Sequence, residues 1–233
     1  RTTGIPHNPN IVWVMANDLG SPLSFTGNAG VKTPHIDRLA SEGMYFSRYY
    51  AAASTCAPSR TAIFTGMYPT YLNAQHHHST PDFPPNVKHL AQRLREDGGY
   101  FTANVVNVPD GYPFISFGKR DLCWSGQHDE ALYDSADFAD LKDNQPFFAE
   151  FQCLEPHAPW HSLETYADEG LAVDPAEVEL PPYYPDTPEV RTVWAQYLSS
   201  VQVFDAKVGK VREMLEQAGL LDDTVIVVLT DHG

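Results

Sequence analysis

The sequence predicts an α/β fold in which a parallel sheet is flanked by helices. Three short and almost continuously apolar runs, at residues 10–16, 147–154 and 224–230, are typical of strands buried on both faces. Residues 189–218 carry apolar side chains three and four positions apart, which predicts a long helix with one apolar face. Polar residues follow each apolar run directly. Because ligand sites in open α/β sheets gather at the carboxyl ends of strands, these polar residues are the first candidates for a functional site.

Length and charge restrict the classes of protein to which the chain can belong. Its 233 residues are enough for one large domain, and 42% of them are hydrophobic. The net charge of −15 argues against nucleic acid and anionic membranes as partners, since neither attracts an acidic protein. No apolar run is long enough to span a bilayer, so we expect no membrane span. An anionic substrate would need a local basic pocket.

The first apolar run, residues 10–16, leads directly into Asn17 and Asp18. Two oxygen-bearing side chains in succession suit a hard cation such as calcium. By themselves they are weak evidence, because Asn-Asp shortly before Gly20 is more often only a turn.

The next predicted element is a helix with Thr33 as its cap, Pro34 at its first position and Gly43 at its end. We interpret His35 inside this helix as structural. Residues 44–52 mix aromatic and small side chains, which predicts a strand that leads into the following loop.

The segment after that strand combines three features that suit attack on a sulfate or phosphate ester. Pro58 predicts a helix start, so Cys56 lies just ahead of a helix N-terminus, where free N–H groups favour an anion. Arg60, one turn further, is expected to reach the same spot as a cation and donor fork. Gly66 suits the helix end. The alternative for a lone cysteine is a buried structural residue before an ordinary helix.

These residues resemble the signature of the sulfatase family, which reads Cys-x-Pro-Ser-Arg followed by Thr-Gly-x-x-Pro. The matching residues here are Cys56-Ala57-Pro58-Ser59-Arg60 and Thr65-Gly66-Met67-Tyr68-Pro69. The resemblance implies an alkaline-phosphatase-like sandwich with a mostly parallel, mixed sheet. It also implies that a formylglycine-generating maturation enzyme oxidises Cys56 to formylglycine, whose hydrated aldehyde is the nucleophile.

The same resemblance implies a metal site built from both ends of the chain. Sulfatases carry an Asp-Asp pair where this sequence has Asn17 and Asp18, so one negative charge is lost. Asp231 and His232 follow the last predicted strand and correspond to the second half of the site, with Cys56 beside them. The implied cation is Ca²⁺, with Mg²⁺ as the other candidate.

A histidine-rich loop follows the signature helix, at His76-His77-His78. Neighbouring side chains cannot all ligate one ion, because they point in opposite directions. The loop is either an ordinary polar loop or a substrate-contacting one, and resemblance to sulfatases that act on sugars makes His77 the substrate-binding candidate. Residues 86–97 then predict a helix, and residues 100–106 predict a strand.

A candidate sulfate-binding lysine follows at Gly118-Lys119. The family has a Gly-Lys motif near this position, and many members carry a histidine two residues after the lysine, where this chain has Asp121. The alternative interpretation of Lys119 is a solvated loop residue.

A rigid histidine follows the second core strand. Residues 127–141 predict a helix, and residues 147–154 then lead to Pro156-His157-Ala158-Pro159. A histidine between prolines is held for general acid or base work, and the family has a Pro-His-x-Pro element here. We take His157 as catalytic, with His161 as the second choice. Residues 162–188 predict an irregular surface loop.

The cysteine content and the first residues of the chain bear on the cellular location of the protein. Three cysteines do not form a disulfide framework, and Cys123 and Cys153 either pair or are both free. No signal peptide is visible, but the chain opens at Arg1 and one can have been removed. We expect a secreted, periplasmic or lysosomal protein in preference to a cytoplasmic one.

The sequence thus predicts a sulfuric ester hydrolase that acts on a sulfated carbohydrate, in which Cys56, Arg60, Lys119 and His157 carry the chemistry. Family members continue further, so we expect residues 1–233 to be the N-terminal portion of a catalytic domain. One alternative is a phosphonate or phosphodiester hydrolase of the same superfamily, and another is a non-catalytic binder of sulfated glycans. The oligomeric state is left open.

Overall fold

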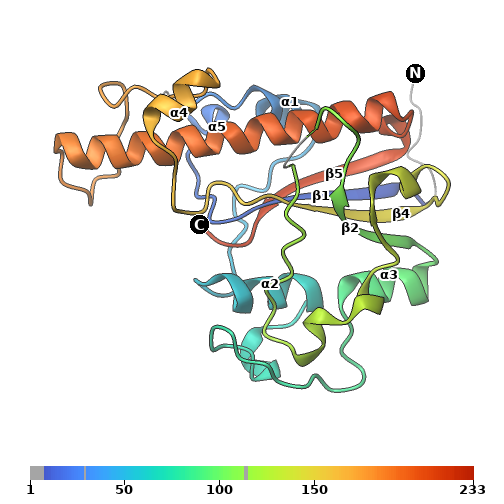
Figure 1. Cartoon of the computed structure of the whole chain (residues 1–233). Helices are drawn as coiled ribbons and strands as arrows, with labels where there is room; N and C mark the ends of the chain where they lie inside the picture. Colours follow the sequence, from blue (N-terminus) through green and yellow to red (C-terminus); the bar gives the residue numbers. More distant parts are fainter. Residues whose placement is uncertain (1–7, 29, 113–114) are drawn as a thin grey trace.

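A parallel sheet crosses the centre of the molecule and carries helices on both faces (Figure 1). The computed structural model describes residues 8–28, 30–112 and 115–233; Arg1, where the chain opens, lies outside them. In this part of the chain the sheet has five strands in the order β3-β2-β4-β1-β5, and every pairing is parallel. The strands are β1 (Asn10–Ala16), β2 (Phe101–Asn107), β3 (Ser135–Asp137), β4 (Phe147–Gln152) and β5 (Thr224–Thr230).

Helices cover the two faces of the sheet in separate layers (Figure 1). One layer contains α1 (Pro34–Glu42), α4 (Leu163–Asp168) and the long α5 (Pro188–Gln217). The other contains α2 (Cys56–Thr65) and α3 (Leu90–Gly98). Short 3₁₀ turns complete the described elements: η1 (Ser24–Thr26), η2 (Pro69–Leu72), η3 (Ser125–His128), η4 (Glu130–Leu132), η5 (Phe138–Leu141) and η6 (Leu221–Asp223).

Burial on both faces explains why the strands read as continuous apolar runs. In β1, Val12 and Val14 belong to the core cluster that includes residues of α5. Between them, Trp13 packs with Phe64 of α2 and Phe148 of β4 on the opposite face. Since successive side chains of a strand point to opposite faces, both sets must be apolar when helices cover both sides.

The prediction of a strand at residues 44–52 was wrong. The segment has no strand structure, and its aromatic side chains are exposed, with Phe46 at 68% and Tyr50 at 82%. Aromatic composition favours a strand only where a neighbouring strand offers a hydrogen-bonding partner, and in the described residues none pairs with this segment.

The prediction of a helix at residues 127–141 was also wrong, because side chains there compete for the backbone. Asp129 accepts a hydrogen bond from the N–H of Ala131, and the hydroxyl of Ser135 accepts one from the N–H of Asp137. Such bonds offer the backbone an alternative to the helix, and the segment forms 3₁₀ turns and β3 instead. Residues 162–188 are mainly irregular as predicted, with the short α4 inside them.

The ends of two predicted helices differ in detail. In α3 the helix begins at Leu90 because the His89 side chain accepts from the N–H of Ala91 and serves as the cap. At α1, Thr33 makes no capping bond. Instead the buried Asp205 carboxylate of α5 accepts from the N–H groups of His35 and Ile36, which joins the two helices.

None of the helices in the described part of the chain combines the length and apolar character that crossing a bilayer requires.

Candidate active site

The ends of β1 and β5 place the predicted polar residues side by side. The two strands pair in parallel through Ala16 and Thr230, so the residues that follow each of them leave the sheet at the same edge. The Oδ1 atom of Asp231 accepts the N–H of Asp18 at 3.0 Å, across the two loops. The first and last strands are therefore neighbours, as a shared metal site requires.

Four of the predicted residues converge on one point: Asp18, Cys56, Asp231 and His232. One potential ligand atom from each lies within 4.8 Å of all the others. His232 Nε2 lies 3.0 Å from Oδ1 of Asp18 and 3.3 Å from Sγ of Cys56. Asp231 is fully buried, whereas the other three are partly exposed. The cluster is therefore reachable from solvent through Asp18, Cys56 and His232.

The donor set of this cluster fits a hard cation. It contains two carboxylates, from Asp18 and Asp231, and oxygen atoms are the ligands that Ca²⁺ and Mg²⁺ prefer. The amide oxygen of the buried Asn17, next to Asp18 in the chain, accepts a hydrogen bond from Lys119. The buried Nδ2 atom of Asn17 has no hydrogen-bond partner among the described residues. Because buried polar atoms are usually hydrogen-bonded, this atom points to a missing polar partner just after β1. His232 belongs to the same set of potential ligands, and its Nε2 atom can ligate a cation when the ring carries its proton on Nδ1.

Cys56 is the first residue of α2, one step inside the helix and not just ahead of it as predicted. Thr55 is the flanking residue in extended conformation, and its carbonyl accepts the N–H of Ser59. The helix therefore starts two residues before Pro58. Its far end is as predicted, because Gly66 adopts a left-handed conformation and closes the last turn.

The environment of Cys56 disfavours a thiolate. Burial raises the pKa of this thiol, and the carboxylates of Asp231, Asp18 and Asp121 raise it further, while Lys119 acts in the opposite direction. The unmodified side chain is thus a protonated thiol near neutral pH, which is a weak nucleophile.

Arg60 is 1% exposed and lies beneath the site, not at its surface. Its Nη1 atom is 3.3 Å from Oδ2 of Asp231, and its Nη2 atom donates to the carbonyl of Lys119 at 3.0 Å. Nη2 also donates to the side chain of Gln152. The expectation that Arg60 reaches out to a substrate differs from this geometry, in which the guanidinium is occupied by its own chain.

Lys119 enters the site and is not a solvated loop residue. Its Nζ atom donates to Oδ1 of Asn17 at 3.0 Å and lies 3.1 Å from Oδ2 of Asp121. The other oxygen of Asp121 lies 3.7 Å from Nδ1 of His78. The histidine-rich loop therefore folds back toward Lys119, but through His78. The predicted His77 is exposed and packs against His78, with the two rings tilted by 45° and their centroids 3.7 Å apart.

His157 lies near the carboxylate of Asp18. Its Nδ1 atom donates to the carbonyl of Ala158, which can only accept, so the proton of a neutral ring sits on Nδ1. The Nε2 atom lies 3.8 Å from Oδ2 of Asp18 and faces the cluster. The second-choice His161 packs against Tyr166 of α4 and has no contact with the cluster residues.

The other two cysteines are both free and buried, which resolves the alternative left open by the sequence. The thiol of Cys123 donates to the carbonyl of His76, and that of Cys153 donates to the carbonyl of Ile115. Burial raises the pKa of Cys153 to about 12, so this residue behaves as a small apolar side chain.

Sequence reasoning missed three contributors to the site. Glu150 and Gln152 are polar residues inside the apolar run at residues 147–154, and this interruption of the run was the sequence signal that could have identified them. Tyr197 lies within the helix predicted at residues 189–218, yet its hydroxyl accepts the N–H of Gly20 at 2.9 Å and supports the loop that carries Asp18. Asp18 itself adopts a left-handed backbone conformation, with φ of 64°.

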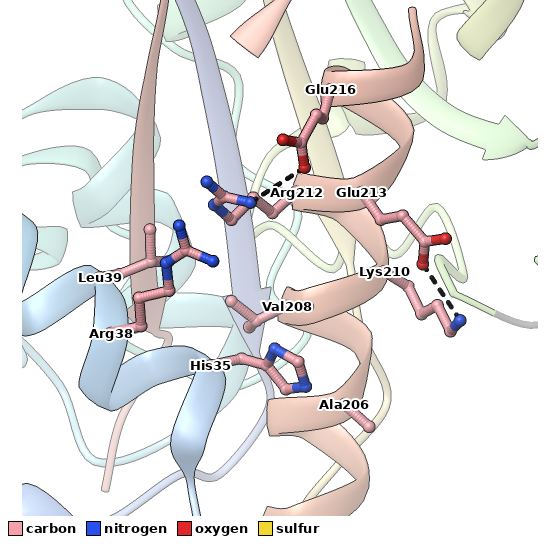
Figure 2. Close-up of a pocket in the computed structure, with 10 residues that line it drawn as sticks. His35, Arg38, Leu39, Ala206, Val208, Lys210, Arg212, Glu213 and Glu216 are labelled. Carbon is pink, nitrogen blue, oxygen red and sulfur yellow. Dashed lines mark hydrogen bonds and ion pairs between the residues drawn. The ribbon is translucent and has the colours of Figure 1, made fainter. Parts of the chain in front are cut away.

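A cavity of about 290 Å³ between α1 and α5 contains none of the predicted catalytic or metal residues (Figure 2). Its charged side chains pair along α5, as Arg212 with Glu216 and Lys210 with Glu213. His35 lines this cavity, and its ring packs on Gly209, where any Cβ would lie 2.5 Å from the ring. This cavity is therefore an ordinary gap between two packed helices, and the charged side chains named above form ion pairs with each other.

Comparisons with known proteins agree with this geometry. A protein-family profile described as Sulfatase matches residues 9–233. The chain is 30% identical to an ulvan-active sulfatase of Formosa agariphila over 98% of its own length and 44% of that protein. It is 26% identical to the human N-sulphoglucosamine sulphohydrolase over 96% of its own length and 50% of that protein. The chain thus spans about half the length of these curated relatives.

The fold also matches a solved structure. A Bacteroides fragilis protein assigned to the sulfatases superposes with a TM-score of 0.70 at 23% identity, covering 97% of this chain and 62% of that one. The alkaline-phosphatase-like arrangement predicted from the sequence is therefore present in the described part of the chain.

Proposed function

Because the chain belongs to the sulfatase family, we propose that its protein hydrolyses sulfuric esters of carbohydrates. One observation carries the proposal: Asp18, Cys56, Asp231 and His232 converge, and Lys119 and His157 face the same point. The carbohydrate class is supported by two relatives whose names refer to ulvan and to N-sulphoglucosamine.

The nucleophile follows from the position of Cys56. We propose that a formylglycine-generating maturation enzyme converts it, and that the resulting aldehyde hydrate supplies an oxygen nucleophile at the helix N-terminus. The raised pKa of the thiol supports this, because an unmodified Cys56 is poorly suited to attack an ester itself.

The proposed cation is Ca²⁺, with Mg²⁺ as the alternative, held by Asp18 and Asp231 with the amide oxygen of Asn17. A bound divalent cation neutralises sulfate charge and orients the reacting groups. His232 Nε2 lies 3.0 Å from Asp18 and 3.3 Å from Cys56, where it can ligate the cation or hydrogen-bond to the nucleophile, according to its tautomer. Together these residues hold an anionic group against an acidic surface that would otherwise repel it.

The remaining polar residues have separable roles. The Lys119 side chain is 21% exposed, and its ammonium group can replace a contact with Asn17 or Asp121 by a hydrogen bond to a sulfate oxygen. Arg60 positions Asp231 from below. In its doubly protonated form the His157 ring carries a second proton on Nε2, beside Asp18, and can give that proton to the leaving alcohol oxygen.

We further propose that residues 1–233 form the N-terminal portion of a longer catalytic domain, since the relatives are about twice as long. A secreted, periplasmic or lysosomal location is part of the same proposal.

The test is peptide mass analysis of Cys56 in full-length protein produced with a maturation enzyme, together with turnover of a sulfate ester and a phosphodiester in parallel. We expect formylglycine at position 56 and preferential sulfate release, both abolished in Cys56→Ala. Preferential phosphodiester turnover would assign the protein to diester hydrolysis. Binding of sulfated glycan without turnover by converted protein would make it a binder.

A further inference from the structure

Gln152 occupies a junction beneath the active site that the proposed chemistry does not use. It ends β4, a central strand of the sheet (Figure 1), and is 1% exposed. It points to the face covered by α2, because Phe147, Ala149 and Phe151 of the same strand belong to the core on the α5 side. A polar side chain at this depth is stable only with its hydrogen bonds satisfied.

The side chain of Gln152 connects two charged groups. Its Oε1 atom accepts a hydrogen bond from Nη2 of Arg60, and its Nε2 atom donates to Oε2 of Glu150 at 2.7 Å. The second oxygen of Glu150 accepts the hydroxyl of Tyr133 at 3.0 Å. The result is a continuous buried chain of hydrogen bonds that ends, through Arg60, on the Asp231 carboxylate.

The polarity of this chain permits one orientation of the amide. A guanidinium only donates hydrogen bonds, and the ionised Glu150 carboxylate only accepts them. Turning the Gln152 amide by half a rotation would set donor against donor at Arg60 and oxygen against oxygen at Glu150. The amide is therefore locked, and it locks in turn the plane of the Arg60 guanidinium.

The backbone of Gln152 holds a second part of the site. Its N–H donates to Oγ of Ser116 at 2.9 Å, and its carbonyl accepts the N–H of Phe117 at 2.7 Å. These residues precede Lys119, whose carbonyl accepts from the same Arg60 guanidinium. One residue thus joins the arginine below the site to the loop that carries the lysine above it.

We propose that Gln152 is a positioning residue: by orienting Arg60 it fixes the Asp231 carboxylate and the Lys119 loop for cation and sulfate ester. The expected effect on turnover rests on the proposed function, whereas the expected effect on the Arg60–Asp231 contact does not. Substitution of outer partners of metal-ligating groups typically costs about 10- to 100-fold in metal affinity or activity.

The test compares three variants of the full-length, converted protein. Gln152→Met keeps the length of the side chain and removes its polar atoms. The double variant Gln152→Glu, Glu150→Gln exchanges the two side chains. The carboxylate at position 152 then accepts from Arg60, and the amide at position 150 donates to that carboxylate. Gln202→Met is the matched control, because Gln202 is a buried glutamine of α5 that also makes two side-chain hydrogen bonds, but to residues remote from the cluster.

For Gln152→Met we expect kcat for a sulfate ester and the affinity for Ca²⁺ each to fall about tenfold or more, with KM within about threefold. The exchanged pair should recover both to within about threefold, since its donor–acceptor order is restored. Gln202→Met should change neither. Equal losses in Gln202→Met, or no recovery in the exchanged pair, would overturn the proposal and leave a merely structural role.

A crystal structure of Gln152→Met separates this inference from the proposed function. We expect the contact between Nη1 of Arg60 and Oδ2 of Asp231, at 3.3 Å in the native chain, to be lost. An unchanged contact would overturn the positioning role even if the enzyme is a sulfatase. A lost contact in a protein without sulfate-ester turnover would support the positioning role and refute the proposed function. If Gln152→Met does not fold, the kinetics of the exchanged pair decide.

Discussion

The Nζ atom of Lys119 donates a hydrogen bond to Oδ1 of Asn17 at 3.0 Å, at the position where family members carry a carboxylate. The contact links the group expected to bind sulfate to the group expected to bind the cation. With a neutral amide at position 17, the ammonium is held by a hydrogen bond and by Asp121, at 3.1 Å. The charge of residue 17 should therefore control both cation and substrate binding.

Asn17→Asp should increase the affinity for Ca²⁺ about tenfold, which corresponds to about 1.4 kcal/mol. A carboxylate is a stronger ligand than an amide for a hard cation and adds a negative charge. The same charge should hold Lys119 more tightly and raise KM for a sulfate ester. Calorimetric titration with Ca²⁺ measures the first effect, with Asp231→Asn as the opposite control. An unchanged affinity in Asn17→Asp would place residue 17 outside the cation site.

His157→Gln should lower kcat by about 10²- to 10⁴-fold for esters of ordinary alcohols, the usual contribution of a general acid. The loss should be much smaller for an ester whose leaving group is acidic and needs no proton. The measurement is kcat across leaving groups of graded acidity, with His161→Gln as the control because His161 lies against α4. A uniform loss across the series would indicate that His157 binds sulfate instead.

Local sequence patterns were sufficient for the core strands β1, β4 and β5 and for the edge at which the site lies. Continuous apolar runs predicted β1, β4 and β5, and the polar residues after them proved to converge. The reason is physical: parallel strands covered on both faces must be apolar throughout, and their carboxyl ends meet at one edge.

The same patterns were insufficient where contacts depend on how distant segments pack. That Arg60 lies under the site depends on its contact with Gln152 of β4, and no local periodicity encodes that pair. The approach of His78 to Asp121 likewise depends on how two loops fold, so choosing among three adjacent histidines from sequence alone had no physical basis. The failed strand at residues 44–52 has the same origin, since strand pairing is not local.

Asp205→Ala should destabilise the fold by about 1 kcal/mol or somewhat more, the usual cost of losing a helix cap. The Asp205 carboxylate accepts from the N–H of Ile36 at 2.8 Å and of His35 at 3.3 Å, so its removal leaves the first turn of α1 without partners. Chemical denaturation measures the loss. Asp205→Asn keeps an acceptor oxygen and should cost less; equal losses in both variants would argue against the cap.

Glu150→Gln should remove a specific pH dependence of stability. Burial raises the pKa of Glu150 to about 7 from its ordinary 4.5, while hydrogen bonds from Gln152 and Tyr133 act in the opposite direction. A carboxyl whose pKa is higher in the folded state stabilises the fold fully below pH 4.5, and this stabilisation is lost as the pH rises to about 7. The difference amounts to about 3 kcal/mol.

The measurement is the free energy of unfolding of both proteins between pH 4.5 and 8. Burial also raises the pKa of Asp205, to about 6, so the wild type alone cannot assign the slope. The difference in unfolding free energy between wild type and Glu150→Gln can assign the slope to Glu150, because Asp205 contributes equally to both proteins. We expect the wild type to lose stability relative to the variant as pH rises through this range. A constant difference would mean that Glu150 is ionised in the folded protein throughout, stabilised by the nearby charges of Arg60 and Arg120 more than burial opposes it.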